Sequence, residues 1–276
     1  MKLFRHKKGF FELGNKCIVV GIVNVTPDSF SDGGLFFDSD NAVRQALKLS
    51  SEGADIIDLG AMSTRPGSEP VSADEEIRRL ASVLQKLNNE NIVVSVDTVN
   101  SKTADYVLSN GADIINDVSG RFNEEMADVV KKHSAGWIMT HTMNVSAGEK
   151  VIYQDGVVAA VNKFFDSFIY NCMYKGIDKD YICLDPGFGF AKTTEDNIEL
   201  LKNLEKTVKS DVAHMTALSR KRFIGEITKT ENATDRMAGT LTADIIAVMK
   251  GTDMIRVHDV KETVQSIAIY NSIEKR

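Results

Sequence analysis

Short apolar runs rich in β-branched residues recur along the chain and alternate with longer amphipathic stretches. A run that is apolar at almost every position is typical of a strand covered on both faces, as in a parallel sheet wrapped by helices. The pattern therefore predicts eight buried strands. They are expected within residues 17–25, 54–60, 92–98, 112–118, 137–142, 181–187, 212–219 and 254–260.

Amphipathic stretches with recognisable ends fill the intervals between these runs. Ser72 and Glu75 have the spacing of a capping box, and the apolar residues after them recur every three or four positions, which predicts a helix. Thr194 or Asp196 is expected to cap another helix, and residues 155–175 place their large apolar side chains along one side. Glycines just before the next strand are expected to end several helices. These glycines are Gly53, Gly111, Gly176 and Gly251.

A weak internal repeat marks three of the junctions between helix and strand. Gly53-Ala-Asp-Ile-Ile-Asp58 recurs as Gly111-Ala-Asp-Ile-Ile-Asn116 and, more loosely, as Gly251-Thr-Asp-Met-Ile-Arg256. A repeated strand–helix unit requires similar residues at each junction between helix and strand. We therefore interpret the repeat as structural and not as a binding motif.

Eight strand–helix units in 276 residues average about 35 residues each, and eight-unit barrels typically contain roughly 250 residues. The predicted fold class is α/β, a single (β/α)8 TIM barrel over residues 1–276, with residues 1–16 as an N-terminal extension. A doubly wound open sheet is the alternative. The absence of Gly-x-Gly-x-x-Gly after the first strand argues against that alternative.

Charge and cysteine content narrow the classes of partner and compartment. The chain has 33 Lys and Arg against 39 Asp and Glu, a net charge of −6, which argues against nucleic acid as a partner. No stretch approaches the roughly 18 apolar residues of a membrane span, so no membrane partner is expected. Three scattered cysteines without a C-x-x-C pair argue against disulfides and structural zinc, and they favour a reducing compartment. We expect a cytoplasmic protein.

Polar or charged residues follow each predicted strand at its carboxyl end. In a barrel these ends and the loops after them carry the active site. Buried polar atoms cost free energy unless a partner satisfies them, so their convergence predicts a polar ligand in the barrel mouth. In chain order the residues are Asn24, Ser63 to Arg65, Asp97, Asn116 with Asp117, His141, Asp185, Ser219 with Lys221, and Arg256 with His258.

The charges of this mouth divide into two sets. The cationic set suits a phosphate or diphosphate and consists of Arg65, Lys221, Arg256 and His258. The second set is rich in acceptors and suits the N–H edge of a heterocycle, because a carboxylate accepts two N–H bonds side by side. It consists of Asp97, Asn116 and Asp185. Arg220 and Arg222 beside Lys221 fit a solvated run of charge.

The loop after the first strand, residues 24–34, is long and dense in turn-forming residues, and Gly33-Gly34 permits backbone movement. Asn24, Asp28 and Asp32 make this loop a candidate lid or Mg²⁺ site, since Mg²⁺ takes oxygen ligands and shares them with phosphates.

Searches for other catalytic motifs exclude several classes. Residues 187–193 differ from a P-loop because Pro186 and Ala191 stand where glycines are required. The absence of H-E-x-x-H and G-x-S-x-G disfavours a zinc protease and an α/β-hydrolase. Cys17, Cys172 and Cys183 lie in apolar contexts and are interpreted as core residues.

Taken in order, several segments resemble the dihydropteroate synthases of folate biosynthesis, which are pterin-binding enzymes. The matching segments cover residues 24–34, Ser63-Thr-Arg-Pro-Gly67, Ser95-Val-Asp-Thr98, Ile115-Asn-Asp117, Leu184-Asp-Pro-Gly187, Ser219-Arg-Lys221 and Arg256-Val-His258. The resemblance implies condensation of (7,8-dihydropterin-6-yl)methyl diphosphate with p-aminobenzoate, which gives 7,8-dihydropteroate and diphosphate. It implies Mg²⁺ as cofactor, a homodimer, and competition by sulfonamides at the aminobenzoate site.

The resemblance also assigns roles to individual residues. Those implied in catalysis are Asp97, Lys221, Asp28 and Asp32, and those around the pterin are Asp97, Asn116, Asp185 and Lys221. Those at the diphosphate are Asn24, Thr64, Arg65, Arg256 and His258. Thr64, Arg65, Pro66, Phe190 and Ser219 border the aminobenzoate, and Asn24 and Asp32 hold Mg²⁺.

Small departures from the family pattern keep two alternatives open. The family usually has Met-His-Met after the fifth strand, where this chain has Met139-Thr-His141-Thr-Met-Asn144. Gly60-Ala61 replaces Gly-Gly, and Ala217 stands where glycine is common. The alternatives are a pterin-binding methyltransferase that serves a corrinoid, and a non-catalytic pterin-binding paralogue. The intact loops 24–34 and 63–67 and the cationic set disfavour the first, because a methyl-folate donor brings no diphosphate.

A homodimer has separate support in an apolar stripe on one predicted helix. The stripe consists of Met237, Leu241, Ile245 and Met249. These residues face either a partner subunit or the barrel, and the sequence leaves both orientations open.

Overall fold

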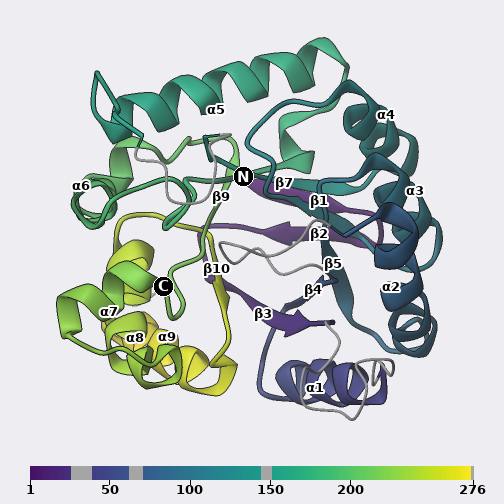
Figure 1. The fold of residues 1–276 in the computed structure, drawn as a ribbon, viewed down its shortest axis with the longest axis horizontal. Helices are drawn as coiled ribbons and strands as arrows, with labels where there is room; N and C mark the ends of the chain where they lie inside the picture. Colours follow the sequence, from purple (N-terminus) through teal and green to yellow (C-terminus); the bar gives the residue numbers. More distant parts are fainter. Residues whose placement is uncertain (26–38, 62–70, 144–150, 275–276) are drawn as a thin grey trace.

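Eight parallel strands form a closed barrel in the computed structural model, which describes residues 1–25, 39–61, 71–143 and 151–274 (Figure 1). Around the barrel the strand order is β10-β3-β4-β5-β6-β7-β8-β9. The strands are β3 (Ile18–Asn24), β4 (Ile56–Gly60), β5 (Val93–Asp97), β6 (Ile114–Asp117), β7 (Gly136–Thr140), β8 (Ile182–Asp185), β9 (Ala213–Thr216) and β10 (Met254–Val257). Seven lie within the predicted apolar runs, and β7 begins one residue before its predicted run of 137–142, so the barrel prediction is confirmed.

Helices surround the barrel, as Figure 1 shows. The α-helices are α1 (Ser39–Ser51), α2 (Ala73–Leu87), α3 (Ser101–Ser109), α4 (Glu124–His133), α5 (Val157–Tyr174), α6 (Thr194–Lys202), α7 (Arg222–Thr228), α8 (Met237–Met249) and α9 (Val260–Glu274). Short 3₁₀ turns are η1 (Lys179–Tyr181), η2 (Leu204–Lys206) and η3 (Ala233–Arg236). Within the described ranges, no helix is both long enough and apolar enough to span a bilayer.

Side chains cap the starts of α2, α3, α4 and α6, with two differences from expectation. Ser72 accepts a hydrogen bond from the Glu75 amide, but the Glu75 carboxylate accepts from Arg78 and Arg79, so only half of the predicted capping box forms. The cap of α6 is Thr193, not Thr194 or Asp196. Asp196 completes a full capping box with Thr193, because its carboxylate accepts from the Thr193 amide at 2.9 Å.

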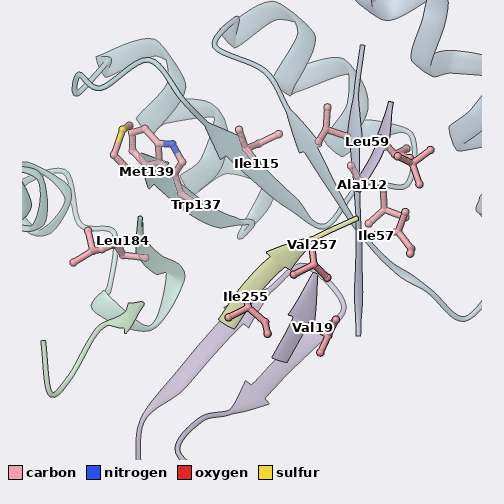
Figure 2. Packing of buried hydrophobic residues seen from close by; sticks show 14 of the residues in the cluster. Val19, Ile57, Leu59, Ala112, Ile115, Trp137, Met139, Leu184, Ile255 and Val257 are labelled. Carbon is pink, nitrogen blue, oxygen red and sulfur yellow. The ribbon is translucent and has the colours of Figure 1, made fainter. Parts of the chain in front are cut away.

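Strand alternation divides the apolar side chains between the barrel interior and the surrounding helices. Outward-facing residues such as Val19, Ile57 and Ile255 belong to the core between barrel and helices, part of which Figure 2 shows. Inward-facing residues fill the amino-terminal half of the barrel interior. They are Ile18, Val20, Ile56, Ile114, Ile138, Cys183, Ala213, Met215 and Met254. This interior layer is packed, so the barrel is not a pore.

A β-hairpin of β1 (Leu3–His6) and β2 (Gly9–Glu12) packs against the amino-terminal end of the barrel. Phe4 and Leu13 belong to the interior apolar cluster, and Lys8 contacts buried Asp113 at 3.0 Å. The hairpin covers the end of the barrel at which the apolar layer lies. The opposite end, formed by the carboxyl termini of the strands, is lined by polar side chains.

Candidate active site

A layer of polar side chains lies in the barrel interior, two residues nearer the carboxyl ends of the strands than the apolar layer. Because alternate residues of a strand share a face, Ile56 is followed by Asp58, Ile114 by Asn116, Cys183 by Asp185, and Met254 by Arg256 on the inward side. Asp97, at the end of β5, pairs in register with Asn116. The side chains of Asp58, Asp97, Asn116 and Asp185 are buried. The mouth predicted from the strand ends is therefore formed.

Asp58 is the centre of a hydrogen-bond network in this layer. Its Oδ2 accepts from the Nε of Arg256 at 2.7 Å and from the Nδ2 of Asn116 at 3.1 Å. The Nη2 of Arg256 lies 3.4 Å from the Oδ2 of Asp97. One guanidinium thus contacts two buried carboxylates, and its remaining N–H groups are available to a ligand.

Burial and charge shift the pKa values of these groups in opposite directions. Burial raises the pKa of Asp97 to about 7; Arg256 opposes this rise, whereas the neighbouring carboxylates Asp58 and Asp117 add to it. Burial disfavours the charged form of Arg256, but Asp58 and Asp97 outweigh burial and the pKa of the guanidinium is raised. Arg256 therefore stays cationic, and Asp97 exchanges its proton near neutral pH.

Asp185 and Lys221 face each other across the other side of the mouth. The Oδ1 of Asp185 accepts the Gly187 amide at 2.7 Å, and burial raises the pKa of its carboxyl. Burial lowers the pKa of Lys221 to about 8, while Asp185 acts against that shift. The ammonium of Lys221 lies 4.4 Å from the ring centre of Phe190, a cation–π contact that fixes the ring at the rim.

Ser219 and His258 form a third contact pair at the rim. The hydroxyl of Ser219 lies 2.9 Å from the Nδ1 of His258 and accepts the His258 backbone amide at 3.2 Å. Burial, with the nearby cations Arg220 and Arg256, lowers the pKa of His258 to about 4. The imidazole is therefore neutral at pH 7, so the prediction that His258 belongs to the cationic set is wrong. With Nδ1 accepting from the hydroxyl, Nε2 carries the proton and can donate it to an anion.

The structure brings together most of the predicted site residues. Asp97, Asn116, Asp185, Lys221 and Arg256 lie in or above the polar layer, and Phe190, Ser219 and His258 lie at its rim. Asn24 is exposed at the carboxyl end of β3. Five predicted residues fall outside the described ranges and remain predictions. They are Asp28, Asp32, Thr64, Arg65 and Pro66.

The interpretation of Arg220 and Arg222 as a solvated charge run is correct for only one of them. Arg222 is highly exposed and pairs with Glu226 one helical turn away. Arg220 is partly buried, and its guanidinium donates to both oxygens of Asp259, at 3.0 and 2.5 Å. Its carbonyl also accepts from Arg236. Arg220 therefore joins the loop after β9 to the start of α9.

Two residues of the site have no role in the sequence prediction. Asp58 ends the first copy of the internal repeat, and the equivalent residues of the other two copies are Asn116 and Arg256, both of which it contacts. Lys192, in the loop after β8, donates to the carbonyl oxygens of Gly187 and Phe190, at 2.9 and 3.2 Å. The repeat was a usable signal for Asp58. Lys192 had none, because all but one of its partners are backbone atoms.

Lys192 also contacts His141 and so joins two loops. Its Nζ lies 3.0 Å from the Nδ1 of His141 and 3.3 Å from the His141 carbonyl oxygen. Burial lowers the pKa of Lys192 to about 7, against the attraction of Asp185. At Gly187 the backbone has φ +70°, and a Cβ there would lie 1.9 Å from the His141 carbonyl oxygen. Only glycine allows this close approach of the two loops.

The arrangement suits a flat heterocycle that carries an anionic substituent. Acceptors at Asp97, Asn116 and Asp185 can hold the N–H edge of a ring in the polar layer. Arg256 and neutral His258 offer donors to an anion at the rim. Ser219 is the one hydroxyl of the described site that contacts a base, the imidazole of His258, and no third side chain among the described residues bonds that imidazole as in a catalytic triad. Without that third group, the geometry favours reaction between two bound molecules over a covalent enzyme intermediate.

Comparison with known proteins supports this chemistry. The family model for pterin binding enzymes matches residues 20–258. The chain is 37% identical to dihydropteroate synthase of Synechocystis over 266 residues, which are 95% of this chain and 92% of that protein. Among solved structures, dihydropteroate synthase of Xanthomonas albilineans with 4-aminobenzoic acid matches with a TM-score of 0.88 and 38% identity, over 96% of this chain and 95% of that chain. The Burkholderia cenocepacia enzyme complexed with 7,8-dihydropteroate matches with a TM-score of 0.90 and 30% identity, over 99% and 97% of the two chains.

Proposed function

The chain belongs to the pterin-binding enzyme family, and from this premise we propose that it catalyses the dihydropteroate synthase reaction. The substrates are (7,8-dihydropterin-6-yl)methyl diphosphate and p-aminobenzoate, and the products are 7,8-dihydropteroate and diphosphate. One observation carries the proposal. Buried acceptors for a heterocycle and donors for an anion converge at the carboxyl end of one barrel.

The pterin ring is proposed to lie in the polar layer. Asp97, Asn116 and Asp185 supply acceptors for its ring and exocyclic N–H groups, and Lys221 supplies a donor. A carboxyl group accepts two N–H bonds side by side, one at each oxygen, only when it is ionised. Because the pKa of Asp97 is raised to about 7, binding of the pterin is expected to strengthen as the pH increases through neutrality.

The diphosphate is proposed to lie at the rim beside Arg256 and His258. The bond between the methylene carbon and the diphosphate oxygen breaks, and its electron pair leaves with the diphosphate. Arg256 stabilises the negative charge that develops there, an electrostatic effect that is large in a site shielded from water. The methylene carbon becomes cation-like, and ionised Asp97 offsets that positive charge.

The aminobenzoate is proposed to approach along Phe190 and Ser219. Its amine lone pair forms the new C–N bond to the methylene carbon, and the surplus amine proton passes to solvent. The aromatic ring of Phe190, held against Lys221, offers a flat apolar surface to the incoming ring. No protein nucleophile takes part in this scheme.

Replacement of Lys192 by Met is expected to raise the KM for p-aminobenzoate about tenfold, the effect of about 1.4 kcal/mol. The substitution removes the Lys192 donor from the carbonyl groups of Gly187 and Phe190, and Gly187 keeps only the Phe190 amide at 3.2 Å, so the loop that carries the Phe190 ring loses its side-chain anchor. The KM for the pterin diphosphate should change little. Steady-state kinetics check this, with Lys179→Met, at a surface ion pair, as the control. Equal KM values in the two variants would contradict the role of Lys192.

A Mg²⁺ ion is proposed to accompany the diphosphate at Asn24 and Asp32. Asn24 is exposed at the end of β3 and offers an amide oxygen of the kind that Mg²⁺ takes as a ligand, and Asp32 lies outside the described residues. Within the described ranges, no three His, Cys, Asp or Glu side chains form a metal-binding group. The diphosphate would supply further oxygen ligands to the ion, as substrate phosphates commonly do for Mg²⁺, and when bound the ion would supply positive charge to the leaving group.

Removal of divalent cations with EDTA is expected to lower the condensation rate by about 10²-fold, and added Mg²⁺ should restore it. Affinity for a pterin that lacks the diphosphate should be unaffected by EDTA, and isothermal titration calorimetry measures this control. A full condensation rate in EDTA would contradict the proposed ion.

The homodimer is proposed to form through a groove between α8 and α9, which lie side by side at the lower left of Figure 1. The face of α8 turned to the barrel contains Thr240, Ala243 and Ala247. Of the predicted stripe, Met237 and Met249 are exposed, whereas Ile245 is partly buried and packs against the core at the edge of the groove. The groove is lined by Ile245, Met249, Ser266, Ile269, Tyr270 and Ile273. The side chains of Ile269 and Ile273 are 66% and 72% exposed, which is costly for isoleucine without a partner surface.

The double variant Met249→Lys/Ile273→Lys is expected to be a monomer, whereas the unmodified protein is a dimer. Lysines on both copies would repel each other and remove the apolar surface that the interface buries. Light scattering measures the mass, and Tyr170→Lys on the exposed side of α5 is the control. A monomeric unmodified protein, or a dimeric double variant, would contradict this interface.

Steady-state kinetics with both substrates test the proposed function. Diphosphate release should require p-aminobenzoate, and a sulfonamide should compete with p-aminobenzoate and not with the pterin diphosphate. Diphosphate release that is independent of p-aminobenzoate would contradict the proposal.

A further inference from the structure

Asp58 is a buried carboxylate that bridges strands that are not adjacent. It lies on β4 with no solvent exposure, and the strand order places β3 between it and β10, and β5 between it and β6. Its Oδ2 nevertheless bonds Arg256 of β10 and Asn116 of β6. A carboxylate buried at this depth costs free energy, and a cation together with hydrogen bonds offsets that cost.

The bond to Asp58 determines which way the Asn116 amide faces. An ionised carboxylate only accepts hydrogen bonds, so the NH₂ group of Asn116 must face Asp58 and the amide oxygen must face away. That oxygen, Oδ1, is buried and has no hydrogen-bond partner among the residues that the structure describes. A buried acceptor without a partner is costly unless a ligand supplies the donor.

Asp58 constrains Arg256 in a similar way. Because Nε is bonded to Asp58, the plane of the guanidinium is fixed and Nη2 is directed at Asp97. The planar group then has a defined edge for an anion, which a rotating side chain would lack.

We propose that Asp58 is a positioning residue, which orients the Asn116 amide so that its oxygen receives an N–H group of the heterocycle and fixes the guanidinium of Arg256 for the anionic substituent. The proposal rests on the proposed function for the identity of the ligand. Asp58 itself needs no contact with the substrate. Its effect on binding is transmitted through the two side chains that it bonds.

The chain offers a matched control for Asp58 at the opposite end of the barrel. Asp113 is equally buried, and its Oδ2 likewise accepts two hydrogen bonds, from Lys8 and from the Val94 amide, both at 3.0 Å. The Oδ1 of Asp113, like the Oδ1 of Asp58, has no hydrogen-bond partner within the described part of the chain. The two carboxylates differ in what they hold, since the donors to Asp113 are structural and those to Asp58 line the site.

Calorimetric titration with a 6-hydroxymethylpterin, which has no diphosphate, tests the effect through Asn116. Asp58→Asn should weaken its binding about tenfold, because the new side chain can donate and lets the Asn116 amide reverse. Asp113→Asn should lower the melting temperature and leave pterin binding unchanged. The KM for the pterin diphosphate should rise further in Asp58→Asn, since Arg256 then also loses its fixed orientation.

A double-mutant cycle separates positioning from general destabilisation. In an Asn116→Ala background, Asp58→Asn should no longer alter the affinity for the 6-hydroxymethylpterin, because its effect passes through Asn116. If Asp58→Asn does not fold, Asp58→Ser takes its place in the same cycle.

The outcomes distinguish failure of the positioning role of Asp58 from failure of the proposed function. Pterin binding by Asp58→Asn equal to that of the unmodified protein overturns the positioning role and leaves the proposed function intact. An equal loss of pterin affinity in Asp113→Asn overturns it as well, since it would reflect destabilisation alone. Failure of the unmodified protein to bind the pterin overturns the proposed function, and with it the assignment of the pterin as the ligand of Asn116.

Discussion

Replacement of Asp97 by Ala is expected to lower kcat/KM for the condensation by about 10³-fold, the upper part of the range for loss of one preorganised electrostatic group. Asp97 has two functions in the proposed reaction, which are to accept an N–H group of the pterin and to offset the positive charge on the methylene carbon. Both functions require the ionised carboxylate in a buried position. Steady-state kinetics with saturating p-aminobenzoate measure the loss.

The pKa of Asp97 allows its catalytic function to be separated from any effect on stability. Folding raises the pKa of the Asp97 carboxyl group from about 4 in the unfolded chain to about 7. The stability that this group contributes is therefore fully present below about pH 4 and is lost as the pH rises through about 7. At pH 8 Asp97→Asn should therefore melt no lower than the unmodified protein, while its activity is still lost. A retained rate, or a loss of rate that parallels a lower melting temperature, would contradict the assigned role.

Replacement of Arg256 by Met is expected to impair both stability and activity. Asp58 and Asp97 would remain buried without their cation, and breaking a buried ion pair from one side costs about 3–5 kcal/mol. The diphosphate would also lose its main cationic partner among the described residues, so kcat/KM should fall by about 10²- to 10³-fold. Thermal melting and steady-state kinetics measure the two effects on the same preparation.

Two further arginine variants serve as controls for this prediction. Arg256→Lys keeps the charge but cannot reproduce the planar contacts with Asp58 and Asp97, so it should recover most of the stability and little of the activity. Arg222→Ala removes the exposed ion pair with Glu226, which lies one helical turn away, and should change stability by less than about 1 kcal/mol. Full activity of Arg256→Lys would show that only charge matters at this position, contrary to the fixed geometry inferred here.

The barrel could be predicted from the sequence because its strands are apolar on both faces. Runs such as residues 54–60 stand out against the amphipathic helices, and the glycines at 53, 111, 176 and 251 have positive φ as expected of helix ends. The polar mouth was also predictable, since strand ends such as Asp97 and Asp185 carry charges that an apolar strand otherwise excludes.

The internal repeat shows where sequence reasoning was incomplete. Its aspartates do have the structural function that was expected, because Asp55, Asp113 and Asp253 each accept a backbone amide of the neighbouring strand. The last residue of each copy has a different function, since Asn116 and Arg256 both donate to Asp58 in the barrel interior. One motif thus contains both a structural position and a position of the site, and the spacing alone does not separate them.

Contacts that depend on loop conformation could not be predicted. Phe190 meets Lys221, and Lys192 reaches His141, because the glycine-containing turn after β8 brings backbone and side chains of three loops together. Such contacts have no periodic signal in the sequence. The predicted roles of Asp28, Asp32, Thr64, Arg65 and Pro66 concern residues outside the described ranges and remain predictions.

The most direct test of the account is identification of the product formed by the unmodified protein. Incubation with the pterin diphosphate, p-aminobenzoate and Mg²⁺ should give 7,8-dihydropteroate, identified by mass spectrometry, in equal amount to the diphosphate released. Asp97→Ala under the same conditions should give almost none. Absence of dihydropteroate with the unmodified protein, or methyl transfer from a methylated pterin to a cobalamin in its place, would contradict the central claim.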